Sequence, residues 1–347
     1  MKTKLVIGVT ALNAIDSPGP GIAVIRSLKE SQKFDVRIIG LAYEYLEPGI
    51  YMHDLVDKSY QIPLPGAGIE ALWQRLSYIH QKENMHVLIP NFDAELFNFI
   101  QLAERLAAVG IRTFLPSVEQ FESRHKTNLP ELGKLSNILV PETRSLNSLK
   151  DVKNVSKEWP FPFFIKGRFY DAIRVFSEEQ ANAAFHKLAA AWGYPVIAQK
   201  HVAGEEVNVT AIGDGKGATL GAVAMKKMYV TDKGKAWSGI SIADQTLLGH
   251  SQDLIKALKW PGGLELEWIK DNNGNYQLLE INPRFPAWVY LATGCGQNHP
   301  ELLVQLALGE PPETKIAYET GKLFVRFSFD LLVDIHDFEK ITTKGEL

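Results

Sequence analysis

The stretch that most constrains the fold runs from Gly262 to Trp288, GGLELEWIKDNNGNYQLLEINPRFPAW, and has the pattern of two strands joined by a tight turn. An Asn-Gly pair is typical of a type I′ hairpin turn, which needs positive φ at both central residues. Asn273 and Gly274 are therefore predicted to form that turn. Because side chains alternate between the two faces of a strand, counting outward gives two opposed polar pairs on one face, namely Glu267 with Glu280 and Glu265 with Asn282.

The polar face of this hairpin predicts a metal site. The opposite face is apolar and comprises Leu264, Leu266, Trp268, Leu279 and Ile281. Like charges that oppose each other across a hairpin are destabilising, and a divalent cation removes that repulsion. Carboxylate and amide oxygens are ligands that Mg²⁺ accepts beside substrate phosphates, and Arg284 adds a positive charge next to the metal. The alternative interpretation of the pattern alone is a solvated polar face on a surface hairpin.

The segment LLEINPRF, which ends at Phe285, resembles the metal-binding strand of the ATP-grasp superfamily, nearest to the carbamoyl phosphate synthetase large chain and biotin carboxylase. In that superfamily an acidic residue on the preceding strand, with the Glu and Asn of E-x-N-x-R, holds Mg²⁺ against ATP phosphates. The resemblance implies these metal-binding roles for Glu267, Glu280 and Asn282, and it makes Arg284 the arginine of the motif. It also implies ATP as the nucleotide and Mg²⁺, or Mn²⁺ in its place, as the metal.

Composition narrows the class of protein and its partners. A chain of 347 residues suggests two or three structural units, and 46% hydrophobic residues are enough to form a buried core. The net charge of −3 gives no reason to expect a nucleic-acid partner. The single cysteine, Cys295, suits a reducing compartment, and no apolar run approaches the roughly 18 residues of a membrane span. We expect a cytoplasmic protein that binds neither membranes nor nucleic acid.

The first third of the chain alternates apolar strands with amphipathic helices. Strands are expected at 4–10, 35–43, 85–90 and 111–115, with helices at 18–30, 69–80 and 97–109. This order predicts an α/β domain with a parallel sheet and helices on both faces. Gly19 and Gly21 lack the third glycine of a dinucleotide fingerprint. Ligands bind beyond the carboxyl ends of such strands, which makes candidate substrate contacts of Asn13, Asp16, Asp93 and Glu95.

The middle of the chain carries two lysines in the order that the superfamily uses. FESRHKTNLPELGKLSNILVP, from Phe121 to Pro141, resembles the segment with the first phosphate-contacting lysine, which would be Lys126. FPFFIK resembles the strand that ends in the second ATP lysine, which would be Lys166. An ammonium group suits this role because it is a compact charge that can approach phosphate oxygens. His125 stands where the superfamily usually has Asp.

The loop after Lys166 departs from the superfamily. Gly167 to Arg174, GRFYDAIR, holds a single glycine where a glycine-rich loop usually covers the phosphates with backbone N–H groups. Arg168 and Arg174 could supply charge in place of those amides. Further on, YPVIAQKHVAGEEVN resembles the hinge between the two lobes. The resemblance implies that this hinge contacts the nucleotide. The adenine edge would be bound by Gln199, Lys200, His201 and Val202, and Glu206 would contact the ribose or orient a lysine.

The resemblance covers roughly residues 5–312 and implies a domain order. An N-terminal α/β pre-ATP-grasp domain would occupy residues 1–118, followed by a two-lobed ATP-grasp domain with lobes at 119–197 and 198–312, and by a C-terminal strand region and tail at 313–347. An apolar strand is expected at 323–332 and a mobile flap at 232–241.

The leading hypothesis for the function is an ATP-dependent carboxylate–amine ligase that works through an acylphosphate and releases ADP and phosphate. Lys166 and Arg284 would be the catalytic residues, with Arg284 on the acylphosphate or the substrate carboxylate. The partners would be a small-molecule carboxylate and an amine, and the superfamily often forms homodimers. Two alternatives are a bicarbonate-activating enzyme like carbamoyl phosphate synthetase or biotin carboxylase, and a nucleotide-binding protein without ligase activity.

Overall fold

The computed structural model describes residues 2–14, 18–168, 171–232, 234–314, 316–328 and 330–347. The chain divides into two compact units. Unit 1 comprises Met1–Phe121, Asn208–Glu265 and Asn282–Leu347, and unit 2 comprises Glu122–Val207 and Leu266–Ile281. The four sequence segments expected above stay a prediction. The prediction of an α/β protein is confirmed by a parallel sheet in unit 1 that is covered by helices.

The parallel sheet of unit 1 has the strand order β3-β2-β1-β4. Its strands are β1 (Thr3–Val9), β2 (Phe34–Ala42), β3 (Lys58–Gln61) and β4 (Val87–Ile89). The apolar runs of β1 and β2 suit burial on both faces, as a parallel sheet requires. The strand expected at 111–115 is wrong, because the only pairing there is an isolated bridge between Val87 and Arg112.

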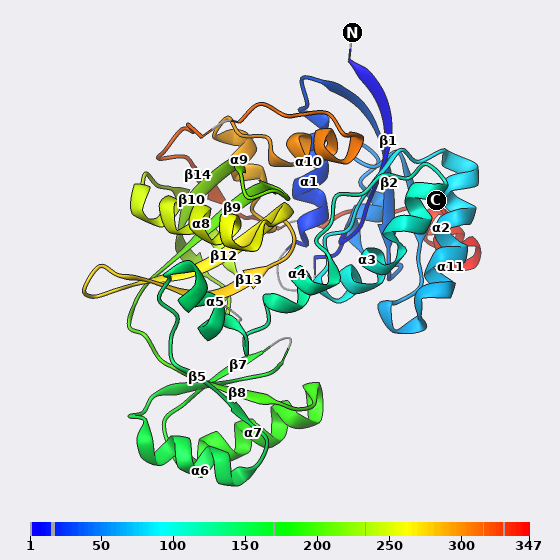
Figure 1. Ribbon diagram of the computed structural model, residues 1–347. Helices are drawn as coiled ribbons and strands as arrows, with labels where there is room; N and C mark the ends of the chain where they lie inside the picture. Colours follow the sequence, from blue (N-terminus) through cyan, green and yellow to red (C-terminus); the bar gives the residue numbers. More distant parts are fainter. Residues whose placement is uncertain (1, 15–17, 169–170, 233, 315, 329) are drawn as a thin grey trace. The chain divides into compact units, whose positions relative to one another are not determined.

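Helices cover both faces of this sheet (Figure 1). On one face, α1 (Pro20–Lys29) and α10 (His299–Leu308) pack against Ile7, Val9 and Ile38. On the other face, α2 (Ile69–Glu83) and α3 (Asp93–Ala108) pack against Ile39 and Leu41. The glycine pair Gly19 and Gly21 at the start of α1 serves packing, since a Cβ at Gly21 would lie 2.1 Å from the carbonyl oxygen of Thr10.

A second sheet has the order β13-β12-β9-β10-β11-β14. Its strands are β9 (Gly204–Asp214), β10 (Thr219–Val230), β11 (Ala236–Ser241), β12 (Pro261–Asp271), β13 (Tyr276–Asn282) and β14 (Leu323–Val325). Helix α8 (Gln245–Leu258) packs on β10, and α9 (Tyr290–Gly294) follows β13 in the chain. The expected flap at 232–241 is wrong for most of its length, because β11 pairs with both β10 and β14. The strand expected at 323–332 is confirmed only for the three residues of β14.

Unit 2 contains an antiparallel sheet of order β5-β8-β6-β7. Its strands are β5 (Thr143–Leu146), β6 (Phe163–Lys166), β7 (Ala172–Val175) and β8 (Val196–Lys200). Helices α6 (Leu149–Glu158) and α7 (Glu178–Trp192) lie together on one face of it (Figure 1). Each begins at a serine whose hydroxyl accepts a backbone N–H of the first turn, Ser148 and Ser177. Two short helices, α4 (Val118–Ser123) and α5 (Leu129–Ser136), precede this sheet in the chain.

The C-terminus forms part of unit 1 and was not expected to be ordered into an element. Helix α11 (Ile335–Lys344) begins at Asp334, whose side chain accepts the backbone N–H of His336. After it, the backbone of Leu347 exchanges two hydrogen bonds with Ser59 at the edge of β3 (2.8 and 2.9 Å). The prediction of an ordinary tail is therefore wrong, because the tail extends the sheet at its open edge.

Candidate functional site

The turn of the β12–β13 hairpin differs from the predicted type. Gly274 adopts the left-handed conformation (φ 86°), whereas Asn273 does not. The backbone N–H of Gly274 donates to the oxygen of Asp271, and the N–H of Asp271 donates to the oxygen of Asn275 (both 2.9 Å). This is a three-residue loop with a glycine bulge, so the predicted two-residue turn is wrong. Both strands of the hairpin are nevertheless present, and the Glu265–Asn282 pair is confirmed by a direct hydrogen bond.

Glu265 is the centre of a polar cluster in unit 1. Its carboxylate is buried at 6% exposure and accepts four hydrogen bonds, one from β9 and three from residues 282–288. Oε1 accepts from Asn208 Nδ2 (2.8 Å) and Trp288 Nε1 (2.7 Å), and Oε2 accepts from Asn282 Nδ2 (3.0 Å) and Arg284 Nη1 (3.1 Å). The sequence placed Glu265 among candidate metal-facing groups. The structure shows instead that its lone pairs are occupied by protein donors.

The hydrogen bond from Asn282 to Glu265 fixes the orientation of the Asn282 side-chain amide. Because its Nδ2 donates to Glu265, the Oδ1 atom of Asn282 is directed to the other side of the amide group. An oxygen is the atom that a hard cation such as Mg²⁺ requires. The orientation therefore fits the predicted role of Asn282 as a metal ligand.

Arg284, the predicted catalytic arginine, is held by two carboxylates of unit 1. Its Nε donates to Asp93 Oδ2 (3.0 Å) and its Nη1 to Glu265 Oε2 (3.1 Å), and its side chain is 16% exposed. Burial by itself would lower the pKa of Arg284, but Asp93 and Glu265 outweigh it and hold the pKa above its usual value. Asp93, predicted as a substrate contact, is thus engaged in positioning Arg284.

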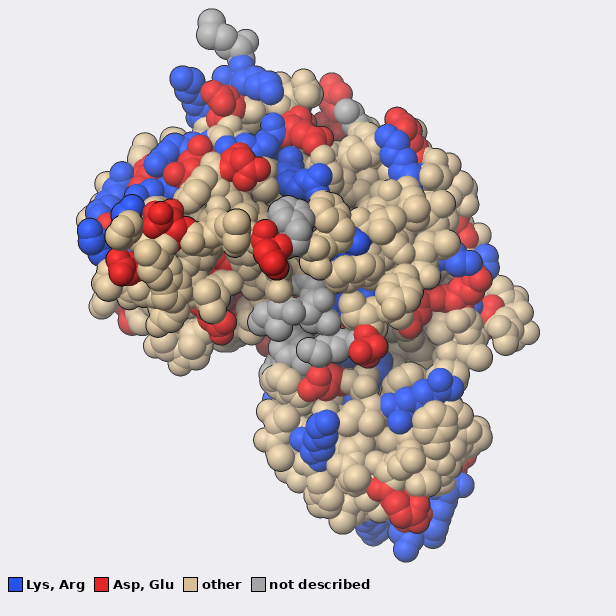
Figure 2. All heavy atoms as spheres, turned by 180° about the vertical axis from the view of Figure 1, so that it is seen from behind, with Lys and Arg blue, Asp and Glu red and all other residues tan. Residues whose placement is uncertain are grey.

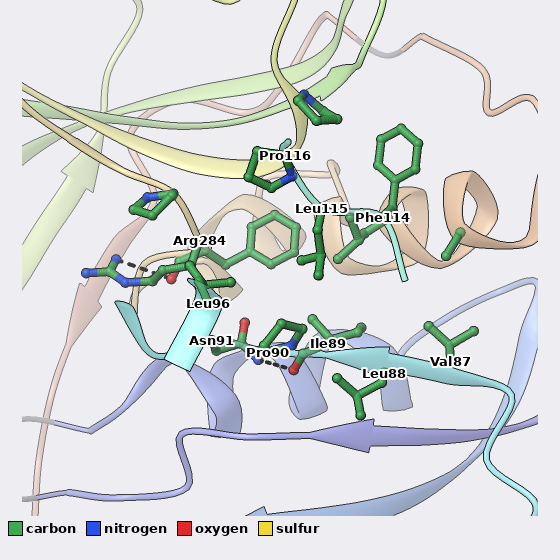
Figure 3. Close-up of a pocket in the computed structure, with 16 residues that line it drawn as sticks. Val87, Leu88, Ile89, Pro90, Asn91, Leu96, Phe114, Leu115, Pro116 and Arg284 are labelled. Atoms are coloured by element: carbon green, nitrogen blue, oxygen red, sulfur yellow. Dashed lines mark hydrogen bonds between the residues drawn. The ribbon is translucent and has the colours of Figure 1, made fainter. Parts of the chain in front are cut away.

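Beside Arg284 lies a narrow cavity at the carboxyl end of β4. Figure 3 shows Leu88, Ile89 and Asn91 along the β4 side, with Phe114 and Leu115 above them. Its volume of about 20 Å³ is close to the roughly 10–15 Å³ that one water needs on this measure. Asn91 is 1% exposed and its Oδ1 atom has no partner among the described residues, so this cavity is suited to one bridging water rather than to a substrate.

Glu95, another predicted substrate contact, is fully buried. Oε1 accepts from the Thr10 hydroxyl and from the backbone N–H groups of Asn91 (2.9 Å) and Phe92 (3.0 Å), and Oε2 accepts from the Tyr43 hydroxyl. Burial raises the pKa of Glu95 to about 7, although these hydrogen bonds oppose the rise. With no exposed surface, Glu95 joins β1, β2 and α3 and does not contact a substrate. Asp16 lies outside the described residues.

The predicted phosphate lysines and acidic ligands form a second cluster, within unit 2. Lys126 lies between α4 and α5 at 8% exposure, and its Nζ donates to Glu280 Oε1 on β13 (2.8 Å). Lys166 ends β6. Burial lowers the pKa of Lys166 to about 8, with Lys126 acting in the same direction and the carboxylates of Glu280, Glu267 and Glu206 opposing it. The structure thus brings together five residues that the sequence analysis selected from four segments.

The predicted adenine-contacting residues lie at the end of β8. Gln199 is buried, and its Nε2 donates to the Thr143 hydroxyl (3.3 Å). The backbone N–H of Lys200 donates to the backbone oxygen of Glu142 (2.9 Å), and its Nζ forms an ion pair with the Glu142 carboxylate (2.5 Å). His201 and Val202 follow in the connection to β9. Their roles in nucleotide binding stay predictions.

Arg326, which sequence reasoning missed, is a candidate ligand contact of unit 1. It directly follows β14, and its Nη1 atom is buried without a hydrogen-bond partner among the described residues. Burial lowers the pKa of Arg326 to about 10, against the opposing charge of Glu265. A guanidinium so poorly compensated is a ready partner for an anionic group. The signal available in the sequence was one arginine inside the apolar run LFVRFSF.

Larger-scale features add little to this picture. Figure 2 shows basic and acidic side chains interspersed over one face, in keeping with the net charge of −3, so anion sites must come from local clusters. Among the described residues, no three His, Cys, Asp or Glu side chains gather as a metal cluster. None of the described helices is long and apolar enough to cross a membrane.

Comparison with known proteins identifies the domain. Residues 194–326 match the family described as ATP-grasp in the biosynthetic pathway with Ter operon. The carbamoyl phosphate synthase large chain of Thermoanaerobacter sp. is 21% identical over 238 residues, which are 64% of this chain and 22% of that protein. This chain therefore spans about a fifth of the length of that relative.

Two solved structures share the fold over nearly the whole chain. Biotin carboxylase from Campylobacter jejuni, solved as a complex with β,γ-ATP, has a TM-score of 0.72 at 18% identity and matches 92% of this chain and 74% of its own. N5-carboxyaminoimidazole synthetase from Staphylococcus aureus has a TM-score of 0.68 at 16% identity and matches 93% and 82%.

These matches define the class: this chain carries an ATP-grasp domain, and the family model covers residues 194–326 of it. Within that superfamily it has homology to carbamoyl phosphate synthase large chains, and its structural neighbours include biotin carboxylases. The resemblance drawn from LLEINPRF is confirmed.

Proposed function

We propose that this protein is an ATP-dependent ligase that joins a carboxylate to an amine through an acylphosphate and releases ADP and phosphate. The observation that carries the proposal is the contact of Lys126 with Glu280, beside Lys166. A carboxylate of the metal-ligand type next to two ammonium groups is the arrangement that a metal-bound polyphosphate needs. The fold shared with biotin carboxylase and N5-carboxyaminoimidazole synthetase supports it.

In this proposal Lys126 and Lys166 bind the phosphate oxygens and hold the negative charge that develops during phosphoryl transfer. Burial lowers the pKa of Lys166, and the carboxylates of Glu280, Glu267 and Glu206 oppose that effect. The adenine edge would be read by the chain at Gln199, Lys200, His201 and Val202, and Glu206 would orient Lys166 or the ribose. Each ammonium is therefore a positioned charge that needs no reorganisation when the phosphoryl group moves.

Glu267, Glu280 and Asn282 would hold Mg²⁺, with Mn²⁺ as an alternative, and the directed Oδ1 atom of Asn282 fits this role. When bound, the metal neutralises phosphate oxygens and makes the phosphorus more electrophilic. Glu265 is a positioning residue in this account, because it orients both Asn282 and Arg284 without facing a ligand itself.

The proposed reaction consists of two displacement steps. An oxygen of the substrate carboxylate attacks the γ-phosphorus, and the bond from that phosphorus to the ADP oxygen breaks. The amine nitrogen then attacks the acyl carbon, the bond from carbon to the phosphate oxygen breaks, and the amine loses a proton to solvent. Arg284 and Arg326 would bind the anionic carboxylate and the developing acylphosphate, since a guanidinium pairs with two oxygens at once.

The test is ADP release from MgATP over a panel of carboxylates and amines. Glu280→Gln removes a metal ligand and is expected to reduce turnover by at least a hundredfold, as expected when a transition-state contact of about 2.7 kcal/mol is lost. Glu178→Gln, in the half-exposed first turn of α7, is the matched control and should turn over like the wild type. Undiminished turnover in Glu280→Gln would remove the metal assignment and with it this function.

A second candidate function is activation of bicarbonate, with ATP, to carboxyphosphate. The observation that favours it is the homology to carbamoyl phosphate synthase large chains together with the biotin carboxylase fold. Bicarbonate-stimulated ADP release in the absence of any amine would support it, whereas stimulation only by an organic carboxylate and an amine together would support the ligase.

A further inference from the structure

The six-stranded sheet ends at β14, and no strand of the described chain pairs with the outer side of β14. The backbone N–H of Arg326 donates to the oxygen of Trp237 (3.0 Å), so the backbone of Arg326 faces β11. Because successive residues of a strand direct their backbone groups to opposite sides, those of Leu323 and Val325 point to the open side. The outer side of β14 therefore presents donors and acceptors with which another strand can pair.

The side chains beside these free backbone groups are apolar. Leu323, Val325 and Phe327, which lies two residues beyond β14, are each more than half exposed. The intervening Phe324 points to the other face and packs against the buried cluster that contains Trp288. Edge strands usually carry a charged residue or a proline that prevents pairing, and the outward positions here carry neither. This edge is therefore open to pairing by its backbone and by its side chains.

The apolar row continues onto the neighbouring strands. Leu323 lies opposite Ile240 of β11, and Val325 lies opposite Ser238, which in turn lies opposite Tyr229 of β10. Residues that oppose each other in an antiparallel pair lie on the same face of the sheet. Ile240 is half-buried and Tyr229 is exposed. The open edge thus borders an exposed apolar area, and such areas mark protein contacts.

The sequence predicts a longer strand at this place than the structure contains. The apolar run that begins at Leu323 favours a strand, yet only residues 323–325 form β14, and they pair on one side only. Hydrogen bonds on the open side would extend the strand to Phe327. A partner with an edge of its own would therefore complete the strand that the sequence predicts.

A second copy of the same edge is complementary to this row. Two antiparallel copies of β14 can be related by a two-fold axis, which makes the contact self-complementary. An axis at Val325 places Val325 opposite itself and Leu323 opposite Phe327 of the second copy. All the outward side chains of one copy then meet apolar side chains of the other.

Charge favours this register over the neighbouring one. With the axis at Val325, Lys322 lies opposite Ser328 of the second copy and Arg326 lies opposite Phe324. With the axis at Phe324, Lys322 would lie opposite Arg326, and like charges that oppose each other directly are destabilising. The axis at Val325 avoids this repulsion.

We propose that this chain forms a symmetric dimer through antiparallel pairing of residues 323–327 with the same residues of a second copy, with the two-fold axis at Val325. The contact continues the sheet of one copy into that of the other. Such a short edge corresponds to a small interface, so we expect a dissociation constant of about 1–100 µM. The inference does not depend on the proposed function, because it uses no group that binds nucleotide or metal in that proposal.

The test is sedimentation velocity of the purified protein at concentrations from about 1 to 200 µM. The wild type should change from monomer to dimer over this range. Val325→Lys and Val325→Glu each place two like charges opposite each other at the axis, so each variant alone should remain monomeric. An equimolar mixture of the two variants opposes unlike charges and should recover the dimer. Because only a residue that faces itself gives this pattern, the mixture tests the register as well as the surface.

Leu64→Lys is the matched control, since Leu64 is exposed to a similar degree elsewhere in unit 1, and it should dimerise like the wild type. Because Val325 is exposed, neither of its substitutions should change the thermal unfolding of the dilute protein, and this is measured first. Hydrogen exchange of a peptide spanning residues 322–328 should slow with concentration in the wild type and in neither variant alone. A wild type that stays monomeric at about 200 µM, a dimer that persists in both variants, or a mixture that stays monomeric would each overturn the proposal.

Discussion

Glu265→Gln gives the sharpest test of how the unit 1 cluster is built. The substitution keeps the size of the side chain and removes its charge. In the wild type each carboxylate oxygen accepts two hydrogen bonds, one pair from Asn208 and Trp288 and the other from Asn282 and Arg284. A glutamine has one oxygen and one NH₂ group, so in either orientation two donors of the protein face a donor instead of an acceptor.

The expected cost follows from these four contacts. A buried donor left without an acceptor costs about 1–3 kcal/mol, so two donors cost roughly 2–6 kcal/mol. Removing one charge of a buried pair costs about 3–5 kcal/mol by itself, and the charge of Arg284 would retain only Asp93 as its partner. We therefore expect Glu265→Gln to lower the free energy of unfolding by about 3–5 kcal/mol, with lost hydrogen bonds and lost charge counted as one effect.

The assay is urea unfolding of the protein without metal or nucleotide, followed by the fluorescence of its seven tryptophans. These include Trp288, whose Nε1 donates to Glu265. At an m value of about 3 kcal/mol per molar, the midpoint should fall by about 1 M or more. Glu267→Gln, two residues along the same strand and half-buried, is the matched control and should shift the midpoint little. A change below about 1 kcal/mol for Glu265→Gln would refute the view that this carboxylate holds the cluster together.

Three further predictions concern charged groups. Burial lowers the pKa of Lys166 to about 8, so the affinity for MgATP should fall by up to about tenfold per pH unit above that value. The Lys166→Met variant should show no such pH dependence. A Kd of the wild type that stays constant from about pH 7 to 9.5 would contradict the prediction. Burial raises the pKa of Glu95 from 4.5 to about 7, so the stability that it contributes is full below pH 4.5 and is lost as the pH rises through 7. The free energy of unfolding, wild type minus Glu95→Gln, should decline over that window, and a flat difference would exclude the shift. Arg326→Gln removes a charge whose Nη1 atom is buried without a hydrogen-bond partner among the described residues, so the melting temperature of the variant should rise. The KM for the carboxylate substrate should increase at the same time. A lower melting temperature would show that the protein already compensates the charge of Arg326.

The sequence predicted the elements that carry their own periodic pattern. The strands at 4–10 and 35–43 and the helices at 18–30 and 69–80 are confirmed within a few residues, because each buries a continuous run or a helical stripe. β3 was missed, since its four residues have no pattern of their own and are held by β2 on one side and by the C-terminal residue on the other. Such an edge strand depends on partners that are distant in sequence.

β11 shows how glycine and polar residues can conceal a strand. Its sequence AWSGIS favoured a flexible loop, yet a Cβ at Gly239 would lie 2.4 Å from the sulfur of Met225 and 2.8 Å from the ring of Phe324. The glycine is therefore required by close packing across the sheet. Glycine in a strand interior often marks a close approach of another part of the molecule, and local sequence cannot distinguish this from a loop.

The candidate site was predictable where it depends on one strand and less so where it depends on several. Glu280, Asn282 and Arg284 were found because they follow one another at every second position of a single segment. The lysines were found from the resemblance, and the structure places both next to the predicted acidic residues. Arg326 was not found, because its role depends on the burial of its guanidinium by segments far apart in the sequence.

Glu265 and Glu267 show why the sequence could not separate a predicted ligand from a residue that positions other groups. They lie two residues apart on one strand, and the pattern treats them alike. The difference comes from residues 208, 282, 284 and 288, which surround Glu265 with donors and leave it 6% exposed. A carboxylate with both oxygens so occupied has little capacity left for a metal. Glu265 instead orients its neighbours, because it turns the amide oxygen of Asn282 away from itself and holds the guanidinium of Arg284 in one place. The positioning role of Glu265 therefore depends on these surrounding donors, which the pattern of the strand alone does not reveal.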